Sequence, residues 1–127
     1  MNEQIEKNMQ NKRTGGQILA DQLAIQGVDR IFCVPGESYI ALLDGLHTHK
    51  DTISVVQTRH EGGASYMAEA YGKLTGKPGI CMVTRAPGAT NASCGLHTAF
   101  QDSTPMVLLI GQVARDMVDR EAFQEID

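Results

Sequence analysis

Four short apolar runs alternate with longer segments of helical periodicity, and this alternation restricts the fold more than any other feature of the chain. The runs are 30–34, 53–57, 80–84 and 106–110. Runs that are apolar throughout, rather than at every second residue, are typical of parallel strands buried on both faces of a sheet. Helical patterns lie before the first run and between the others, at 14–26, 37–46, 61–74 and 87–100. The sequence therefore predicts a doubly wound α/β domain, with a mostly parallel sheet and helices on both faces.

The length and the two ends of the chain define the expected domain. The chain has 127 residues, which suits one domain with one core. Residues 1–13 are mostly polar and are expected to form a flexible leader, whereas residues 14–127 are expected to form the folded domain. Residues 124–127 contain no element that would close the fold. We therefore expect the domain to be truncated at its C-terminal end.

Composition and charge argue against several classes of partner. The net charge is -4 and 5% of the residues are aromatic, whereas nucleic acids and anionic membrane surfaces favour basic patches. No apolar run approaches the length needed to span a membrane. Cys33, Cys81 and Cys94 show no CxxC spacing, so neither a disulfide framework nor a zinc site is indicated. We expect a cytoplasmic protein that binds no nucleic acid, no membrane and no metal through this chain, with Cys33 and Cys81 buried in strands.

Each apolar run ends in small residues that carry a few polar groups. These breaks are 34–36, 60–63, 85–91 and 111–113. In a parallel sheet the carboxyl ends of the strands lie along one edge, where open α/β sheets bind their ligands. Neither GxGxxG nor GxxxxGK[ST] occurs, and no recognisable base accompanies Ser38 or Cys94. The breaks indicate a small-molecule site that is neither a dinucleotide site nor a Ser or Cys nucleophile site.

Glu61 lies at the junction between the second apolar run and the helical segment that follows it. A carboxylate at this point is close to the positive end of a helix dipole and to N–H groups without intrahelical partners. Gly62 and Gly63 leave room for a ligand to approach the backbone. On local grounds, Glu61 is either an ordinary first-turn acid that stabilises its own helix or a functional carboxylate at the ligand-binding edge.

An ordered set of short motifs resembles one known family. The motifs are Val34-Pro35-Gly36, Arg59-His60-Glu61-Gly62-Gly63-Ala64, Gly76-Lys77-Pro78-Gly79, Pro87-Gly88-Ala89-Thr90-Asn91, Gly111-Gln112-Val113 and Ala122-Phe123-Gln124-Glu125. Each motif is loose when taken singly, but the set in this order is specific. From about Gln17 to Asp127, the chain resembles the N-terminal, pyrimidine-binding domain of thiamine-diphosphate enzymes of the acetolactate synthase and pyruvate oxidase type.

The resemblance implies roles for individual residues. In the family, the acid that matches Glu61 hydrogen-bonds the N1′ nitrogen of the cofactor's aminopyrimidine ring. It thereby favours the imino tautomer that removes the proton from C2 of the thiazolium. Gln112 resembles the family glutamine that faces the reacting centre, so Glu61 and Gln112 are the expected catalytic residues. The expected cofactor-binding residues are Pro35, Gly36, Glu61, Pro87, Gly88 and Asn91.

The resemblance also implies cofactors and partners. Enzymes of this type act on a 2-oxo acid by decarboxylation and carboligation, with thiamine diphosphate, Mg²⁺ and, in the acetolactate synthase branch, FAD. Their diphosphate and Mg²⁺ site lies in a C-terminal domain with a GDG…N motif, which this sequence lacks. The active site forms between two subunits, so the implied state is a homo-oligomer. This chain is not expected to be active alone.

Two departures and one alternative accompany this interpretation. Gly62 follows the acid where acetolactate synthases commonly have Gln, and Ala86 stands where they usually have Gly. A non-catalytic binding or assembly module, or a truncated paralogue, would keep the same fold.

We expect self-association through the helical segments 61–74 and 87–100, because small residues would allow close packing of helices there. These small residues are Ala64, Ala68, Ala92 and Ala99.

Overall fold

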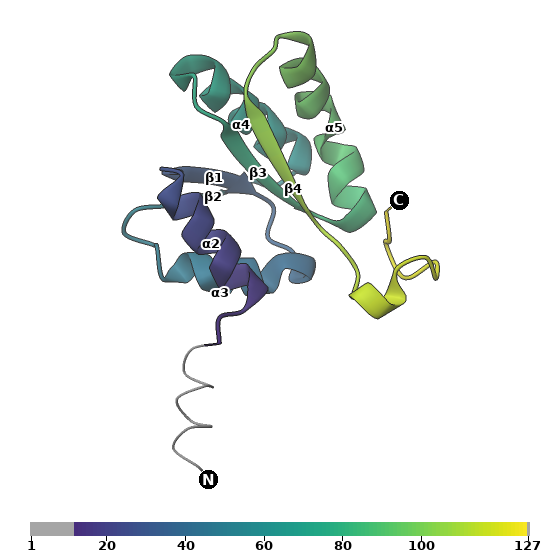
Figure 1. The fold of residues 1–127 in the computed structure, drawn as a ribbon. Coiled ribbons are helices and arrows are strands. Elements are labelled where there is room, and N and C mark those ends of the chain that lie inside the picture. The colour runs from purple at the N-terminus through teal and green to yellow at the C-terminus, as the bar shows by residue number, and fades with distance from the viewer. Residues whose placement is uncertain (1–11, 127) are drawn as a thin grey trace, which may run out of the picture.

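The computed structural model describes residues 12–126, and within this range the sheet is parallel throughout (Figure 1). Its strands are β1 Arg30–Cys33, β2 Ser54–Gln57, β3 Gly79–Thr84 and β4 Met106–Gly111, in the order β2-β1-β3-β4. Each strand boundary lies within one residue of its predicted position. Most of the expected leader, residues 1–11, lies outside the described part of the chain, as does Asp127.

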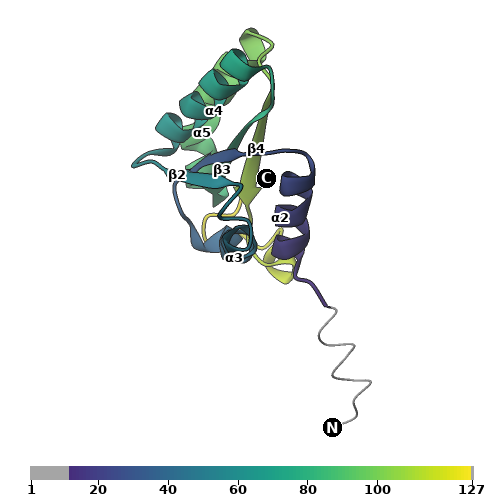
Figure 2. The same ribbon diagram turned by 90° about the vertical axis from the view of Figure 1, so that its left-hand side faces the viewer.

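Helices cover both faces of the sheet, as the sequence predicted. The helices α2 Gly15–Ile25 and α3 Ile40–His47 pack together on one face, and α4 Glu61–Thr75 and α5 Arg85–Gln101 pack on the other (Figure 2). The doubly wound α/β fold is thus confirmed. None of the helices in residues 12–126 is long and apolar enough to cross a membrane.

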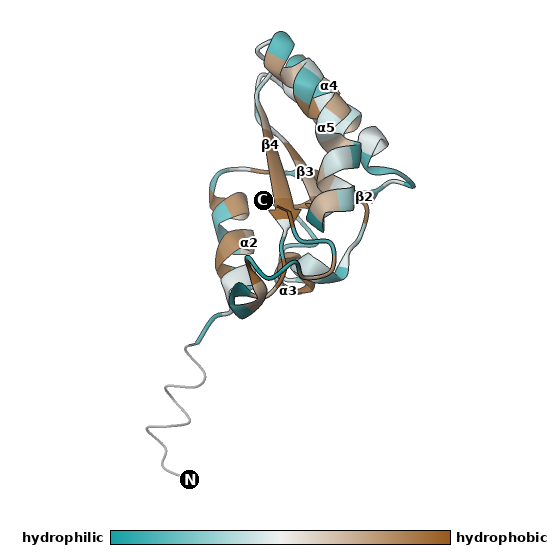
Figure 3. Cartoon of the chain, turned by 90° about the vertical axis from the view of Figure 1, so that its right-hand side faces the viewer, coloured by the Kyte–Doolittle hydropathy of each residue, from teal (hydrophilic) through white to brown (hydrophobic). Residues whose placement is uncertain are grey.

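The side chains of β3 alternate between two cores. Ile80 and Met82 join the core beneath α2 and α3, whereas Cys81 and Val83 join the core beneath α4 and α5. All of these side chains are buried. A central strand of this kind needs apolar residues at every position, which explains the continuous run in the sequence. Figure 3 shows these apolar strands between helices of mixed hydropathy.

Two helix starts differ from the sequence prediction. A 3₁₀ turn, Glu37–Tyr39, precedes α3 where the pattern predicted one continuous helix. The buried Tyr39 hydroxyl donates a hydrogen bond to the carbonyl of Val34, which draws this turn against the end of β1. The helix α5 begins at Arg85, directly after β3, rather than at Pro87. By contrast, α2 begins as predicted after Thr14, which forms a capping box with Gln17.

The alanines expected to mediate self-association have a different role. Ala64, Ala68, Ala92 and Ala99 are at most 3% exposed within their own chain. The first three belong to the core beneath α4 and α5. Their small size therefore brings these helices close to the sheet. The outer faces of α4 and α5 expose larger apolar side chains, namely Tyr66, Met67, Leu74, Leu96 and Phe100.

Candidate functional site

The strand order creates a switch point between β1 and β3. From β1 the chain moves outward to β2, and it then returns past β1 to β3 and β4. Connections that leave in opposite directions open a crevice at the carboxyl ends of the two central strands, where open α/β sheets bind ligands. Because all described strands are parallel, the predicted small-residue breaks lie along this same edge.

The turn after β1 lies directly across the end of β3. Ser38 Oγ and Thr84 Oγ1 share a hydrogen bond of 2.6 Å. A Cβ atom on Gly36 would lie 2.5 Å from the Cβ of Thr84, so a larger residue could not occupy this position without displacing the strand end. Pro35 is exposed beside Gly36. This part of the edge therefore presents backbone rather than side chains.

Glu61 is the first residue of α4 and is half-buried. The loop before it is tied to the sheet, because Thr58 N donates to the carbonyl of Cys33 at 2.8 Å. Thr58 Oγ1 also donates to the carbonyl of His60 at 2.9 Å. The His60 ring caps the helix, since its Nδ1 accepts a hydrogen bond from Gly62 N at 3.0 Å. The backbone is thus held on both sides of Glu61.

Asn91 meets Glu61 across the α4–α5 interface. Its Nδ2 donates a hydrogen bond of 3.0 Å to Glu61 Oε2. The sequence singled out both residues, and the structure brings them together. The carboxylate accepts from an uncharged amide, and this arrangement leaves its second oxygen without a hydrogen-bond partner among residues 12–126.

The first turn of α5 contributes two further predicted residues. Pro87 is exposed at the edge of the sheet, whereas Gly88 is buried. A Cβ atom on Gly88 would lie 3.1 Å from the Cβ of Val83. The small size of Gly88 therefore lets α5 approach β3 in this structure.

Gln112 forms its side-chain hydrogen bonds with residues other than Glu61. Its Nε2 donates to the carbonyl of Ile126 at 2.5 Å, and its Oε1 accepts from Val113 N at 2.9 Å. Both ends of the amide are thus engaged by the chain that follows β4. The predicted catalytic pair therefore lies on the same edge of the sheet without a direct link.

Arg85 is a residue of this edge that the sequence analysis did not identify. Its side chain is 17% exposed, and its Nη2 lies 3.2 Å from Glu37 Oε1. Its Nη1 donates to the carbonyl of Phe123 at 3.3 Å, and its buried Nε has no partner among the described residues. Arg85 also has a φ of 48°, which is strained for a residue with a side chain. The only available signal was an arginine directly after a buried apolar strand.

Burial keeps the groups beneath the edge uncharged. It raises the pKa of the Cys81 thiol to about 12, with a smaller contribution from the charges of Cys33 and Glu61. Burial is also the main reason why the pKa of Tyr39 lies well above its ordinary value. Cys33 and Cys81 are buried, as predicted. Buried, neutral groups therefore lie beneath this edge of the sheet.

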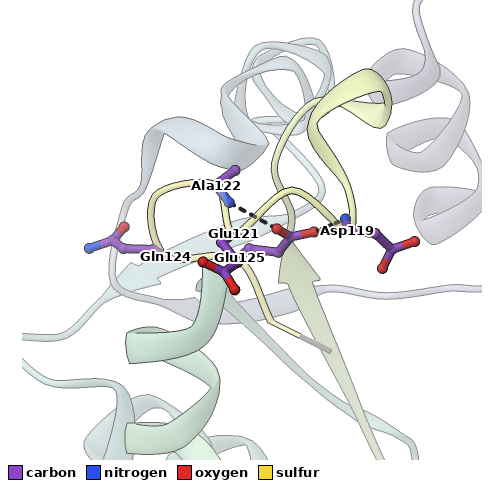
Figure 4. A pocket seen from close by; sticks show the side chains of 5 residues that line it. All are labelled: Asp119, Glu121, Ala122, Gln124 and Glu125. Atoms are coloured by element: carbon purple, nitrogen blue, oxygen red, sulfur yellow. Dashed lines mark hydrogen bonds between the residues drawn. The ribbon is translucent and has the colours of Figure 1, made fainter.

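A hollow of about 520 Å³ lies away from Glu61, in the loop near the C-terminal end (Figure 4). Its lining residues are Asp119, Glu121, Ala122, Gln124 and Glu125. The Glu125 carboxylate accepts hydrogen bonds from Ala122 N and Asp119 N, which lower its pKa and hold the loop closed. The acidic lining disfavours an anionic ligand such as a diphosphate. Within residues 12–126, no group of three or more His, Cys, Asp or Glu residues could hold a metal ion.

Comparison with known proteins identifies relatives over almost the whole chain. Residues 13–127 match the family described as thiamine pyrophosphate enzyme, N-terminal TPP binding domain. The chain is 42% identical over 114 residues to the mitochondrial acetolactate synthase catalytic subunit of Saccharomyces cerevisiae, covering 90% of this chain and 16% of that protein. It is 45% identical over 113 residues to the chloroplastic acetolactate synthase 3 of Brassica napus, covering 89% of this chain and 17% of that protein.

A bacterial relative gives the same result. The chain is 42% identical over 114 residues to the acetolactate synthase large subunit of Buchnera aphidicola, covering 90% of this chain and 20% of that protein. The chain therefore spans no more than a fifth of the length of these relatives. With this match and the α/β fold described above, the chain belongs to the thiamine pyrophosphate enzyme family and corresponds to its N-terminal TPP-binding domain.

Proposed function

We propose that Glu61 binds the ring nitrogen of the aminopyrimidine half of thiamine diphosphate. The observation that carries this proposal is the position of its carboxylate, which lies at the carboxyl edge of the sheet with Oε2 held by Asn91 and Oε1 without a partner among the described residues. Such a carboxyl group can hold or release a proton at a ligand nitrogen. When bound, the cofactor supplies the nucleophilic carbon that attacks the keto group of a 2-oxo acid.

The remaining predicted residues fit the crevice in different ways. Pro35 and Gly36 would contact the ring through backbone atoms, because the turn after β1 presents backbone at this edge. We propose that Pro87, Gly88 and Asn91 form the opposite wall. Their support is that all three lie in the first two turns of α5, beside the end of β3.

Gln112 would face the reacting centre only after its side-chain amide leaves the carbonyl of Ile126. Its amide is engaged by the Ile126 carbonyl and by Val113 N. In the proposed mechanism, the amide exchanges the Ile126 carbonyl for a polar group of the substrate. The hydrogen-bonding capacity of Gln112 supports this role, since an amide both donates and accepts.

We further propose that this domain works with a second domain that binds the diphosphate and Mg²⁺. The acetolactate synthase relatives are several times longer than this chain, which supports the presence of such a partner domain. The proposed whole enzyme decarboxylates one 2-oxo acid and joins the remaining fragment to a second 2-oxo acid. Its proposed location is the cytoplasm, and FAD is a further proposed cofactor. A non-catalytic module is not favoured, because the relatives are acetolactate synthases.

The proposed enzyme is a homo-oligomer with its active site between subunits. Self-association would use the outer faces of α4 and α5, which expose large apolar side chains. Large apolar side chains exposed on two adjacent helices favour an interaction surface there. The proposed interface is adjacent to Glu61 because that residue begins α4.

The test compares Glu61→Gln with the wild type in the full-length enzyme that contains this domain. Two quantities are measured: exchange of the cofactor's C2 proton with solvent deuterium, and release of CO₂ from pyruvate. Both should fall at least a hundredfold, a typical contribution of proton transfer by a side chain. Asp44→Asn, which removes an exposed carboxylate on α3, is the control and should change neither rate. Unchanged C2 exchange in Glu61→Gln would contradict the proposal.

A further inference from the structure

The two carboxylate oxygens of Glu61 are not equivalent. Asn91 Nδ2 donates to Oε2 at 3.0 Å, across two helices and 30 residues of sequence. Oε1 has no hydrogen-bond partner among residues 12–126. The asymmetry arises from residues of this chain alone.

The asparagine amide determines which of the two carboxylate oxygens carries a proton. The nitrogen of an asparagine side chain only donates hydrogen bonds, so the oxygen that faces it must accept. A proton on Glu61 Oε2 would weaken this hydrogen bond, because the hydroxyl oxygen of a carboxylic acid is a poorer acceptor than its carbonyl oxygen. A proton carried by Glu61 in this arrangement therefore resides on Oε1, the oxygen that Asn91 does not contact.

Helix packing keeps Asn91 aligned with Glu61. One turn further along both helices, Gly95 of α5 lies against Ser65 of α4, and a Cβ atom on Gly95 would lie 2.6 Å from the carbonyl carbon of Ser65. Residues four positions apart lie on the same face of a helix. The Asn91–Glu61 pair and the Gly95–Ser65 pair are thus neighbours along one helix interface, which is more rigid than a loop.

We propose that Asn91 is a positioning residue for Glu61, which holds Oε2 and leaves Oε1 as the oxygen that exchanges a proton with a nitrogen of the ligand. This inference rests on the proposed function, in which that nitrogen belongs to an aminopyrimidine ring. It gives Asn91 a role beyond lining a pocket. Loss of its amide should therefore slow proton exchange by a larger factor than it weakens cofactor binding.

The experiment uses Asn91→Ala in the full-length holoenzyme, with Thr90→Ala as the control at an exposed neighbouring position of α5. Asn91→Ala should slow C2 proton exchange of the bound cofactor about tenfold, which corresponds to about 1.4 kcal/mol. The dissociation constant for thiamine diphosphate should rise by a clearly smaller factor than exchange slows, because Asn91 acts on the proton through Glu61 and contributes only part of the pocket wall. Asn91→Asp, which has the same shape but no amide donor, should slow exchange at least as much.

Two results would overturn the inference. In the first, Asn91→Ala exchanges the C2 proton as fast as Thr90→Ala. In the second, exchange and cofactor affinity fall by equal factors, which would indicate a purely structural role. Glu61→Gln separates this failure from failure of the proposed function. If Glu61→Gln slows exchange and Asn91→Ala does not, only the inference is wrong; if Glu61→Gln has no effect, the proposed function is also wrong.

The 127-residue chain offers a readout that needs no cofactor. In the wild type, the side-chain amide protons of Asn91 should exchange with water more slowly than in Glu61→Ala, because Glu61 Oε2 accepts one of them. The exchange rates are measured by NMR on the isotopically labelled chain. Equal rates in the two proteins would show that the hydrogen bond does not persist in solution and would overturn the inference.

Discussion

Replacing Gly95 by alanine would test the helix contact that aligns Asn91 with Glu61. A Cβ atom at Gly95 would lie 2.4 Å from Ser65 Oγ, 2.6 Å from the Ser65 carbonyl carbon and 2.7 Å from Ser65 Cβ. The hydroxyl could rotate away, but the other two atoms are fixed to the α4 backbone. The helices would have to separate by roughly 1 Å to restore an ordinary contact of about 3.5 Å between carbon atoms.

The expected loss of stability combines two opposing effects. Overpacking costs about 1–3 kcal/mol, and the better helix propensity of alanine offsets about 1 kcal/mol. Because backbone atoms obstruct the new methyl group, the upper part of the first range applies. We expect the free energy of unfolding to fall by about 1–2 kcal/mol in Gly95→Ala.

Gly63→Ala is the matched control for this change. Gly63 is exposed near the start of α4, and the nearest atom to an added Cβ is the Thr58 Cβ at 4.0 Å. The same substitution should therefore stabilise the chain by about 0.5–1 kcal/mol. The two variants add the same methyl group and differ in whether a neighbouring helix lies in its way.

Urea unfolding followed by circular dichroism measures both changes. With an m value of about 1.5 kcal/mol/M, the midpoint should fall by about 1 M in Gly95→Ala and rise by about 0.5 M in Gly63→Ala. A Gly95→Ala midpoint at or above the wild-type value would refute the close contact between α4 and α5. It would also remove the support that this contact gives to the Asn91–Glu61 alignment.

Four further predictions follow from the described contacts. Thr14→Ala should lower the free energy of unfolding by about 1 kcal/mol, because it removes the capping box of α2; an unchanged thermal midpoint would contradict this. Burial raises the pKa of Cys33, and it raises that of Cys81 to about 12. Iodoacetamide at pH 8 should therefore modify only the exposed Cys94 in the native chain. Equal labelling of all three thiols would argue against this burial. The same pKa shifts should make the free energy of unfolding fall as the pH rises above about 9, because thiols ionise there in the unfolded chain but not in the folded one. The expected slope is up to about 1.4 kcal/mol per pH unit for each thiol. Urea midpoints at pH 8 and pH 10 measure this loss of stability. Phe100→Asp should weaken the proposed self-association through α5, and sedimentation that matches the wild type would count against that surface.

The accuracy of the sequence prediction differs between strands and helix starts. The strands were predicted within one residue, because burial on both faces requires an unbroken apolar run. The start of α3 was misplaced because Tyr39 reaches back to the Val34 carbonyl and tightens the preceding turn. Arg85 begins α5 two residues before Pro87, where its contacts with Glu37 and Phe123 hold the strained backbone. Those contacts join separate segments and leave no local pattern.

The sequence by itself determined the helices and strands, and it determined that small residues with a few polar groups follow each strand. Periodicity, the Thr14 cap and the small-residue breaks act over a few neighbouring residues, so they can be read without knowledge of the fold. The same reading placed Glu61 at the start of a helix beside the end of a strand.

Only the tertiary structure decided which of these residues meet. Asn91 bonds Glu61, whereas Gln112 bonds the Ile126 carbonyl, and both contacts depend on distances between elements. The burial of Ala64 and Ala92 likewise depends on how closely α4 and α5 approach the sheet. A local pattern records the period and polarity of one segment, but it does not record the spacing between segments. The pairing of side chains at the candidate site is therefore a property of the folded chain.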